Sequence, residues 1–258
     1  MAPRDGSPQI VRLDRTASTN ADAMARARDG ERGPAWIVAR EQTAGRGRHG
    51  RVWSSPPGNL YASCLLTDPC EAEHAPQLGF VAGVALCDAV RAVAPEADVR
   101  LKWPNDLLAW DAKVAGILLE ASRLLDGVLA CVVGIGVNCR SHPDGLPYKT
   151  GDLSEAAGRD VAPERLFERL AETFAAGLEL WDRGRGFADV RSAWLRGGPA
   201  LGAPLAVSSP DRVVRGRFQT IDMLGRLVLQ TETGPVTVEA GDVRWGDGAR
   251  PANEVAVA

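Results

Sequence analysis

A glycine- and arginine-rich segment from Gln42 to Trp53, here called the Gly/Arg loop, carries the most distinctive chemistry in the chain. It reads Gln-Thr-Ala-Gly-Arg-Gly-Arg-His-Gly-Arg-Val-Trp, and no Asp or Glu occurs from Gln42 to Thr67. Glycine lets the backbone approach a ligand closely. The planar guanidinium group of arginine matches the oxygens of phosphate or carboxylate in pairs. The segment therefore predicts a mobile loop that closes over an anion, with a solvated basic loop as the alternative.

A second group of polar residues lies around a proline further along the chain. In Lys102-Trp-Pro-Asn-Asp106 the proline ends strand pairing, because it has no N–H to donate and restricts the residue before it. We expect a rigid corner from which Lys102, Asn105 and Asp106 project, with Lys113 at the mouth of the next strand. Oxygen ligands at such a corner suit a hard cation such as Mg²⁺. The alternatives are ordinary turn chemistry for Asn105 and an exposed turn lysine for Lys113.

A run of small polar residues precedes a strong helix-forming segment near the N-terminus. Ser18, Thr19 and Asn20 stand directly before the helical stretch 21–28. Any one of them can cap that helix. Hydroxyl and amide groups at a helix N-terminus can also bind the polar head of a small ligand. Since three such residues exceed what one cap needs, both roles can hold together.

The remaining pattern predicts the elements that must position these residues. A helix is expected over 78–93 from apolar residues at helical spacing, and others from Pro163 to Trp181 and over 187–195. The Asp126-Gly127 pair is a strong hairpin signal. The expected strands lie at 9–13, 35–39, 60–66, 99–103, 114–121 and 128–138. Consecutive strands joined by hairpins predict an α+β fold with a mixed, largely antiparallel sheet and flanking helices.

The pattern of apolar and turn residues changes after Gly198. Short apolar stretches at 205–207, 213–218, 227–230 and 236–239 alternate with turn residues. This rhythm predicts a small β-barrel packed on the first domain. We therefore expect a catalytic domain over 1–199, a barrel over 200–250 and a disordered tail over 251–258.

Composition narrows the class of protein. The chain has 258 residues, a formal charge of −3 and a pI near 5.7, which argues against general nucleic-acid binding. The N-terminus does not resemble a signal peptide, and no apolar run looks long enough to span a membrane. Five cysteines without a C-x-x-C pair predict buried reduced thiols of a cytoplasmic, soluble protein. Three widely separated histidines show no zinc-ligand spacing.

The order and spacing of these motifs resemble those of the biotin–protein ligase family. The resemblance rests on Ser18-Thr-Asn20, the Gly/Arg loop, Lys102-Trp-Pro-Asn-Asp106, Lys113-Val-Ala-Gly-Ile117 and Gly134-Ile-Gly-Val-Asn138. It runs from about Leu13 to Asn138 and continues weakly through the C-terminal segment. It implies a sheet like that of class II aminoacyl-tRNA synthetases, followed by a Src-homology-3-like barrel.

The resemblance also implies a reaction in two steps. Biotin and ATP, with Mg²⁺, give biotinyl-5′-adenylate and pyrophosphate. A lysine of a biotin carboxyl carrier domain of an acyl-CoA carboxylase then takes the biotinyl group and releases AMP. The family includes monomers and dimers, so a homodimer is one of the expected states.

Site residues follow from the same resemblance, position by position. The implied catalytic residues are Lys113, Arg48 and Arg46. The implied biotin-binding residues are Ser18, Thr19, Asn20, Gln42, Gly45, Arg46, Gly47, Arg48, Trp53, Lys113 and Gly116. The implied ATP- or adenylate-binding residues are Arg48, Arg51, Trp53, Lys102, Asn105, Asp106, Lys113 and Asn138. Asp106 is also the implied metal ligand.

The chemistry of these residues supports such roles on its own. Forming a mixed anhydride brings a carboxylate against a polyanion, so cationic groups must offset the repulsion. A closed Gly/Arg loop would also keep water from the adenylate. Trp53 can stack over a ligand, with core packing as its alternative. Gly134-Ile-Gly136 is not a dinucleotide-binding fingerprint, because no third glycine follows at the right spacing.

Two positions depart from the family pattern. His49 occupies a variable position that is often Arg or Lys, and a solvated side chain is expected there. Thr220 stands where glycine usually precedes Ile-Asp, so no site is transferred to the barrel. About eight residues precede the first strand, and we expect a ligase without the helix-turn-helix domain that some members carry.

Two other functions remain open from the sequence. A lipoate–protein ligase would share the fold and the adenylate chemistry but would lack this Gly/Arg loop. A nucleic-acid-binding module could use the basic loop as its contact. The net negative charge and the scarcity of interleaved aromatic residues disfavour the second alternative.

Overall fold

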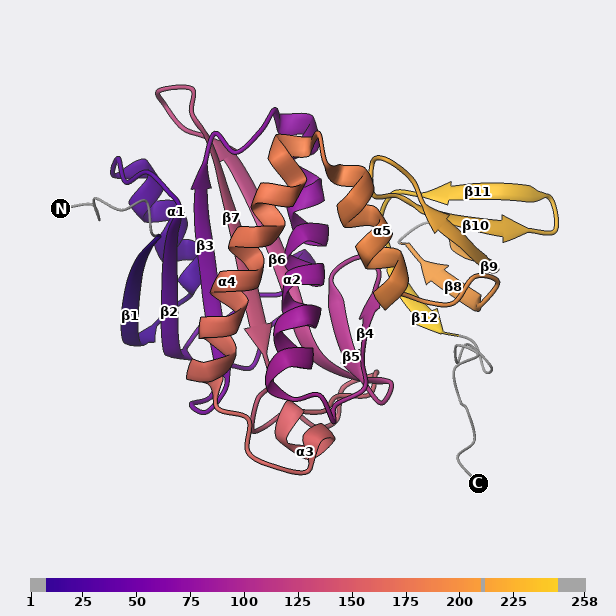
Figure 1. Ribbon diagram of the computed structural model, residues 1–258, viewed down its shortest axis with the longest axis horizontal. Coiled ribbons are helices and arrows are strands. Elements are labelled where there is room, and N and C mark those ends of the chain that lie inside the picture. Colours follow the sequence, from indigo (N-terminus) through magenta and orange to yellow (C-terminus); the bar gives the residue numbers. More distant parts are fainter. Residues whose placement is uncertain (1–7, 210–211, 246–258) are drawn as a thin grey trace.

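The computed structural model describes residues 8–209 and 212–245. A seven-stranded sheet with the order β1-β2-β3-β7-β6-β5-β4 forms its centre (Figure 1). Its strands are β1 (Gln9–Thr16), β2 (Ala35–Gln42), β3 (Leu60–Thr67), β4 (Val99–Lys102), β5 (Asp106–Ala109), β6 (Ala112–Arg123) and β7 (Leu129–Val137). β1 pairs with β2 in parallel and the other neighbours pair antiparallel. The predicted mixed, largely antiparallel sheet is confirmed.

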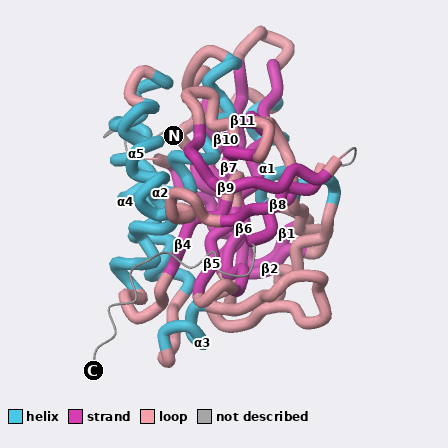
Figure 2. The backbone as a smooth tube through the Cα atoms, turned by 90° about the vertical axis from the view of Figure 1, so that its right-hand side faces the viewer, coloured by secondary structure: helices cyan, strands magenta, loops and turns pink. Residues whose placement is uncertain are grey.

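Helices cover both faces of this sheet. α2 (Leu78–Val93), α4 (Pro163–Trp181) and α5 (Phe187–Gly197) form one layer beside the strands, as Figure 2 shows. Trp36 of β2 anchors α4 there, meeting Phe167 and Phe174 edge-on with ring centroids 5.5 Å apart in each case. α1 (Thr19–Arg28) packs its small apolar side chains on the opposite face, against residues of β2, β3 and β7. The predicted helices are thus present, and a short helix that was not predicted, α3 (Leu153–Ala157), follows the loop after β7.

One helical stretch corrects an expectation about membrane-spanning length. A 3₁₀ turn, η2 (Ala72–Gln77), runs straight into α2, and Ala72–Val93 is long and apolar enough to cross a bilayer by length and composition alone. Most of its apolar window is buried in the protein, because α2 packs against the sheet and beside α4 and α5. This helix is therefore a core element.

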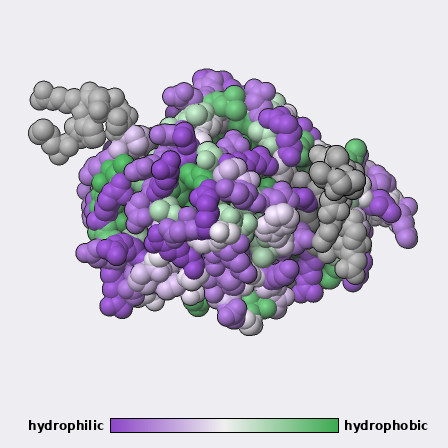
Figure 3. Space-filling view, turned by 60° about the horizontal axis from the view of Figure 1, so that its bottom comes forward, coloured by the Kyte–Doolittle hydropathy of each residue, from purple (hydrophilic) through white to green (hydrophobic). Residues whose placement is uncertain are grey.

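The face in Figure 3 is mostly hydrophilic, with apolar residues in small separate patches.

The C-terminal strands form a second sheet. They are β8 (Pro204–Ser208), β9 (Val213–Ile221), β10 (Leu227–Thr231), β11 (Gly234–Val238) and β12 (Asp242–Trp245), in the order β11-β10-β9-β8-β12. All paired neighbours run antiparallel. This agrees with the small barrel predicted from the sequence, and β12 is a strand that was not predicted. The predicted tail after residue 250 lies outside the described residues.

The two sheets share one hydrophobic core. Apolar residues of both belong to a single buried cluster. The indole N–H of Trp103 donates to the carbonyl of Gly225 at 2.9 Å in buried surroundings. Arg191 of α5 donates to Thr220 Oγ1 and to the carbonyl of Ile221. The hydroxyl at position 220 thus ties the barrel to α5. The division of the chain at residue 199 stays a prediction.

All five cysteines are free and buried. Burial raises the pKa of Cys87 to about 11 and the pKa of Cys131 and Cys139 to about 12. The predicted burial of these thiols is confirmed.

Candidate active site

The Gly/Arg loop leaves the end of β2 and folds back on itself. Arg46 and Val52 form an antiparallel bridge, and the N–H of Trp53 donates to the carbonyl of Gly45 at 2.9 Å. The N–H of Gly47 donates to the carbonyl of Arg51 at 2.7 Å. The loop is therefore a short hairpin held by its own backbone hydrogen bonds.

Each arginine of the loop is held by a different element. Arg46 pairs with Glu120 of β6 at 3.3 Å. Arg48 donates to Asn105 Oδ1 at 3.1 Å. Arg51 pairs with Asp242, the first residue of β12 in the C-terminal sheet. Burial lowers the pKa of Arg48, and the nearby carboxylates of Asp242 and Asp106 oppose that shift.

His49, inside the loop, has a left-handed backbone with φ of 57° and lies exposed. Its solvated side chain is the one expected from the sequence.

A buried polar cluster lies beneath the loop at the start of α1. Ser18, Thr19 and Asn20 are all buried. Ser18 caps α1 by accepting the N–H of Ala21 at 3.4 Å. The N–H and the hydroxyl of Thr19 both donate to Gln42 Oε1, at 2.9 and 3.1 Å. One residue of the run thus serves as the cap, and Thr19 is engaged by Gln42 instead.

Asn20 is held by groups that the sequence did not reveal. Its side-chain N–H₂ donates to Glu120 Oε2 at 2.8 Å and to the carbonyl of Leu118 at 3.2 Å. The hydroxyl of Ser63 lies 2.6 Å from Asn20 Oδ1 and 2.7 Å from Thr19 Oγ1. Ser63 and Glu120 are therefore parts of the site that local sequence patterns could not indicate, since they lie 43 and 100 residues from Asn20.

Three glycines form the floor of the site on β6 and β7. A Cβ at Gly134 would lie 2.1 Å from Asn20 Oδ1. A Cβ at Gly136 would lie 2.5 Å from Trp53 Nε1, and one at Gly116 would lie 3.2 Å from Trp53 Cζ3. Gly116 and Gly136 pair across the two strands. The indole of Trp53 thus lies against a surface formed by glycines, and its buried N–H has no acceptor among the described residues.

Cationic groups gather beside this floor around Asp106. Lys113 Nζ lies 2.6 Å from Asp106 Oδ1, and Lys102 Nζ lies 3.4 Å from Asp106 Oδ2. Lys113 Nζ also lies over the rings of Trp53 and Tyr148, 5.5 and 5.6 Å from their centroids. Tyr148 comes from the loop after β7 and is a further residue that the sequence did not reveal.

Asn138 lies at the end of β7, where a loop returns to the sheet. Its side-chain N–H₂ donates to the carbonyl of Gly151 at 3.0 Å, and its backbone N–H donates to the carbonyl of Val114 at 2.8 Å. The same loop returns alongside Lys113, whose N–H donates to the carbonyl of Lys149 at 2.9 Å. In the structure Asn138 fixes the loop that carries Tyr148.

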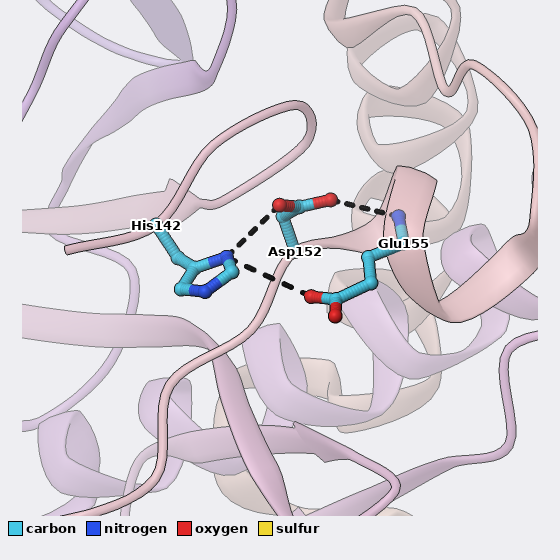
Figure 4. A group of neighbouring side chains, drawn as sticks. All are labelled: His142, Asp152 and Glu155. Atoms are coloured by element: carbon cyan, nitrogen blue, oxygen red, sulfur yellow. Dashed lines mark hydrogen bonds and ion pairs between the residues drawn. The ribbon is translucent and has the colours of Figure 1, made fainter. Parts of the chain in front are cut away.

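The only His/carboxylate group in the described residues whose atoms could hold a metal ion lies on this loop and α3. His142, Asp152 and Glu155 form it (Figure 4). Asp152 Oδ1 accepts the N–H of Glu155 at 2.8 Å and so caps α3, while His142 Nδ1 lies 2.9 Å from Asp152 Oδ2. Glu155 Oε2 is 3.9 Å from His142 Nδ1, and its side chain is exposed. Asp152 therefore has a structural role as the cap of α3.

Comparisons with known proteins agree with this geometry. A sequence model of the Biotin/lipoate A/B protein ligase family matches residues 14–138, and one of the biotin protein ligase C terminal domain matches residues 201–244. The biotin–[acetyl-CoA-carboxylase] ligase of Paracoccus denitrificans is 42% identical over 91% of this chain and 99% of its own length. That of Mycobacterium tuberculosis is 32% identical over 92% of this chain and 89% of its own.

A solved structure shows the same fold. The biotin protein ligase of Aquifex aeolicus in complex with biotin and ATP superimposes with a TM-score of 0.79 at 27% identity, covering 92% of this chain and 99% of that one. The family model by itself includes both biotin and lipoate ligases, whereas these full-length relatives are biotin ligases. The chain therefore belongs to the biotin protein ligase family.

Proposed function

We propose that this chain activates biotin with ATP as biotinyl-5′-adenylate and transfers the biotinyl group to a lysine of a biotin carboxyl carrier domain. The observation that carries the proposal is the side-by-side arrangement of two environments on the glycine floor. One is the uncharged polar cluster of Thr19, Asn20 and Gln42, in which Thr19 and Asn20 are buried and Gln42 is half-buried. The other is the cationic group of Lys113, Lys102 and the loop arginines.

The uncharged cluster suits the ureido ring of biotin. Donors and acceptors fixed by a protein network select a ligand that satisfies them, because a wrong ligand leaves buried polar groups unpaired. Ser18, Gly45, Gly47 and Gly116 complete the proposed biotin-binding set with the loop residues. The carboxylate tail of biotin would then extend over the floor toward Lys113.

The cationic group suits the first chemical step. A carboxylate oxygen of biotin attacks the α-phosphorus of ATP, and the bond from that phosphorus to the bridging oxygen of pyrophosphate breaks. Lys113 and Arg48 would offset the repulsion between the two anions and stabilise charge on the phosphoryl oxygens. Trp53 would cover the intermediate, with Arg51, Lys102, Asn105 and Asn138 on the nucleotide side.

The second step transfers the acyl group. The neutral amine of the acceptor lysine attacks the acyl carbon of the mixed anhydride, AMP leaves with the bond electrons, and the amine loses a proton. Until that amine arrives, the Gly/Arg loop would exclude water from the anhydride. The five free thiols support a cytoplasmic location for this reaction.

Magnesium enters the proposal as part of the nucleotide substrate. The candidate ligand Asp106 has Lys113 at one carboxylate oxygen and Lys102 at the other, and Asn105 Oδ1 accepts from Arg48. These oxygens already face cations, so they do not form a ready-made magnesium site. A metal role for Asp106 requires that one lysine moves away.

Exchange of labelled pyrophosphate into ATP tests the proposed function. We expect exchange that requires biotin and does not occur with lipoate in its place. A mass increase of one biotinyl group on a purified carrier domain, absent when its acceptor lysine is replaced by arginine, tests the transfer step. Exchange with lipoate, or none with biotin, would overturn the proposal.

A further inference from the structure

The C-terminal sheet reaches into the candidate active site through one carboxylate. Asp242 begins β12, which pairs with β8, and its side chain accepts a hydrogen bond from Arg51 Nη2 of the Gly/Arg loop. The two partners are separated by 191 residues in the sequence. Both side chains are about half exposed, 55% for Arg51 and 47% for Asp242. The contact thus joins a loop of the catalytic sheet to the other domain.

The C-terminal sheet that carries Asp242 is packed against the catalytic sheet. The shared hydrophobic core and the hydrogen bond from Trp103 to the carbonyl of Gly225 fix the C-terminal sheet against the catalytic sheet. Trp103 belongs to the Lys102–Asp106 corner, whose Asn105 holds Arg48. The same C-terminal domain therefore contacts both the corner and the loop, the two segments that supply cations to the nucleotide side.

The charges around Asp242 also favour its pairing with the Gly/Arg loop. Burial by itself would raise the pKa of Asp242, but the hydrogen bond and charge of Arg51, with Arg48 and His49, hold it below the ordinary value. Arg51 in turn has a raised pKa, chiefly because of its hydrogen bond to Asp242. Asp242 is thus ionised at neutral pH, in contact with Arg51 and near Arg48.

We propose that Asp242 is a positioning residue that fastens the Gly/Arg loop in its closed arrangement, so that the C-terminal domain helps to retain the adenylate intermediate. This inference rests on the proposed function. Asp242 is not a catalytic residue, because an anion beside the phosphates would repel them. It acts through Arg51, whose orientation it sets.

The first test measures how fast biotinyl-5′-adenylate leaves the enzyme in the absence of acceptor. We expect Asp242→Asn to release it about three- to fivefold faster, the range of a favourable partly exposed ion pair, and Asp242→Glu to restore most of the retention. Glu239→Gln is the matched control, since Glu239 pairs with Arg226 in the same domain at 3.6 Å and is exposed. In an Arg51→Gln background the Asp242→Asn change should add nothing.

A second test needs no substrate. Trypsin cleaves after arginine, so the initial rate of cleavage at Arg48 reports how often the loop opens. We expect faster cleavage in Asp242→Asn than in the wild type or Glu239→Gln, with unchanged melting temperatures. Equal cleavage rates, or a release effect that persists undiminished without Arg51, would overturn the inference. If the wild type forms no adenylate, the proposed function fails, and the cleavage rates alone decide whether Asp242 fastens the loop.

Discussion

Replacing Gly134 by alanine should selectively damage the part of the site that we propose binds biotin. The added Cβ would lie 2.1 Å from Asn20 Oδ1 and 2.8 Å from Asn20 Cγ, distances that no real contact allows. Asn20 cannot swing away freely, because its amide group is tied to Ser63, Glu120 and the carbonyl of Leu118. The substitution must therefore break part of that network.

The magnitude follows from two contributions. Overpacking a well-filled site costs about 1–3 kcal/mol, and each lost hydrogen bond costs about 1 kcal/mol. A total of about 2–4 kcal/mol, if expressed in ligand binding, corresponds to roughly a 30- to 700-fold weaker affinity for biotin. Calorimetric titration with biotin measures this directly, and the KM for biotin in the exchange assay checks it under turnover.

Two other glycine variants test whether the effect is specific to Gly134. In Gly136→Ala the added Cβ would meet Trp53 instead, at 2.5 Å from Nε1, so the KM for ATP and adenylate retention should suffer more than biotin affinity. Beyond its own helix, an added Cβ at Gly79 of α2 would meet no atom of the described residues within 4 Å, and Gly79→Ala should leave both unchanged. A folded Gly134→Ala protein with wild-type biotin affinity would refute the reasoning. So would equal effects of the Gly134 and Gly136 substitutions on both substrates.

Three other predictions follow from the packing of single residues. The π face of the Tyr148 ring lies against Lys113 Nζ, so Tyr148→Leu should lower the rate of pyrophosphate exchange about two- to fivefold, while Tyr148→Phe should keep the wild-type rate. Equal rates in the two variants would contradict this contact. Trp36→Ala should lower the free energy of unfolding by about 3–5 kcal/mol, measured by urea titration, because the indole is buried against α4; a loss below about 1 kcal/mol would contradict the packing. The pKa of Cys87 is raised to about 11 and that of Cys131 to about 12, so about one in a thousand or fewer of these thiols is ionised at pH 8. An aromatic disulfide reagent should therefore modify them only after urea is added. Rapid labelling of the native protein would argue against their burial.

Local signals in the sequence were sufficient for most of the fold. A helix cap within 18–20, the hairpin at Asp126-Gly127 and the apolar spacing of 78–93 each depend on neighbours within a few residues, and the structure contains all three, with Ser18 as the cap. The same is true of the break at Pro104, which falls between β4 and β5. Shorter elements such as α3 and β12 were missed, since four or five residues carry too little periodicity.

The site was predictable only in part. The Gly/Arg loop and the Lys102–Asp106 corner have distinctive compositions, so their cationic groups could be identified from the sequence. Their partners could not: Glu120 lies 74 residues from Arg46, and Asp242 lies 191 residues from Arg51. Each of these carboxylates reads as an ordinary strand residue, and only the folded topology brings it to an arginine.

The central claim is that the Gly/Arg loop holds an activated acyl-nucleotide against the sheet. Its most direct test is to form biotinyl-5′-adenylate on the enzyme, separate the protein rapidly by gel filtration, and quantify the adenylate that remains bound in the wild type and in Arg48→Ala. We expect the wild type to retain close to one molecule per chain and the variant to lose most of it to solution. Equal retention in the two proteins would contradict the claim.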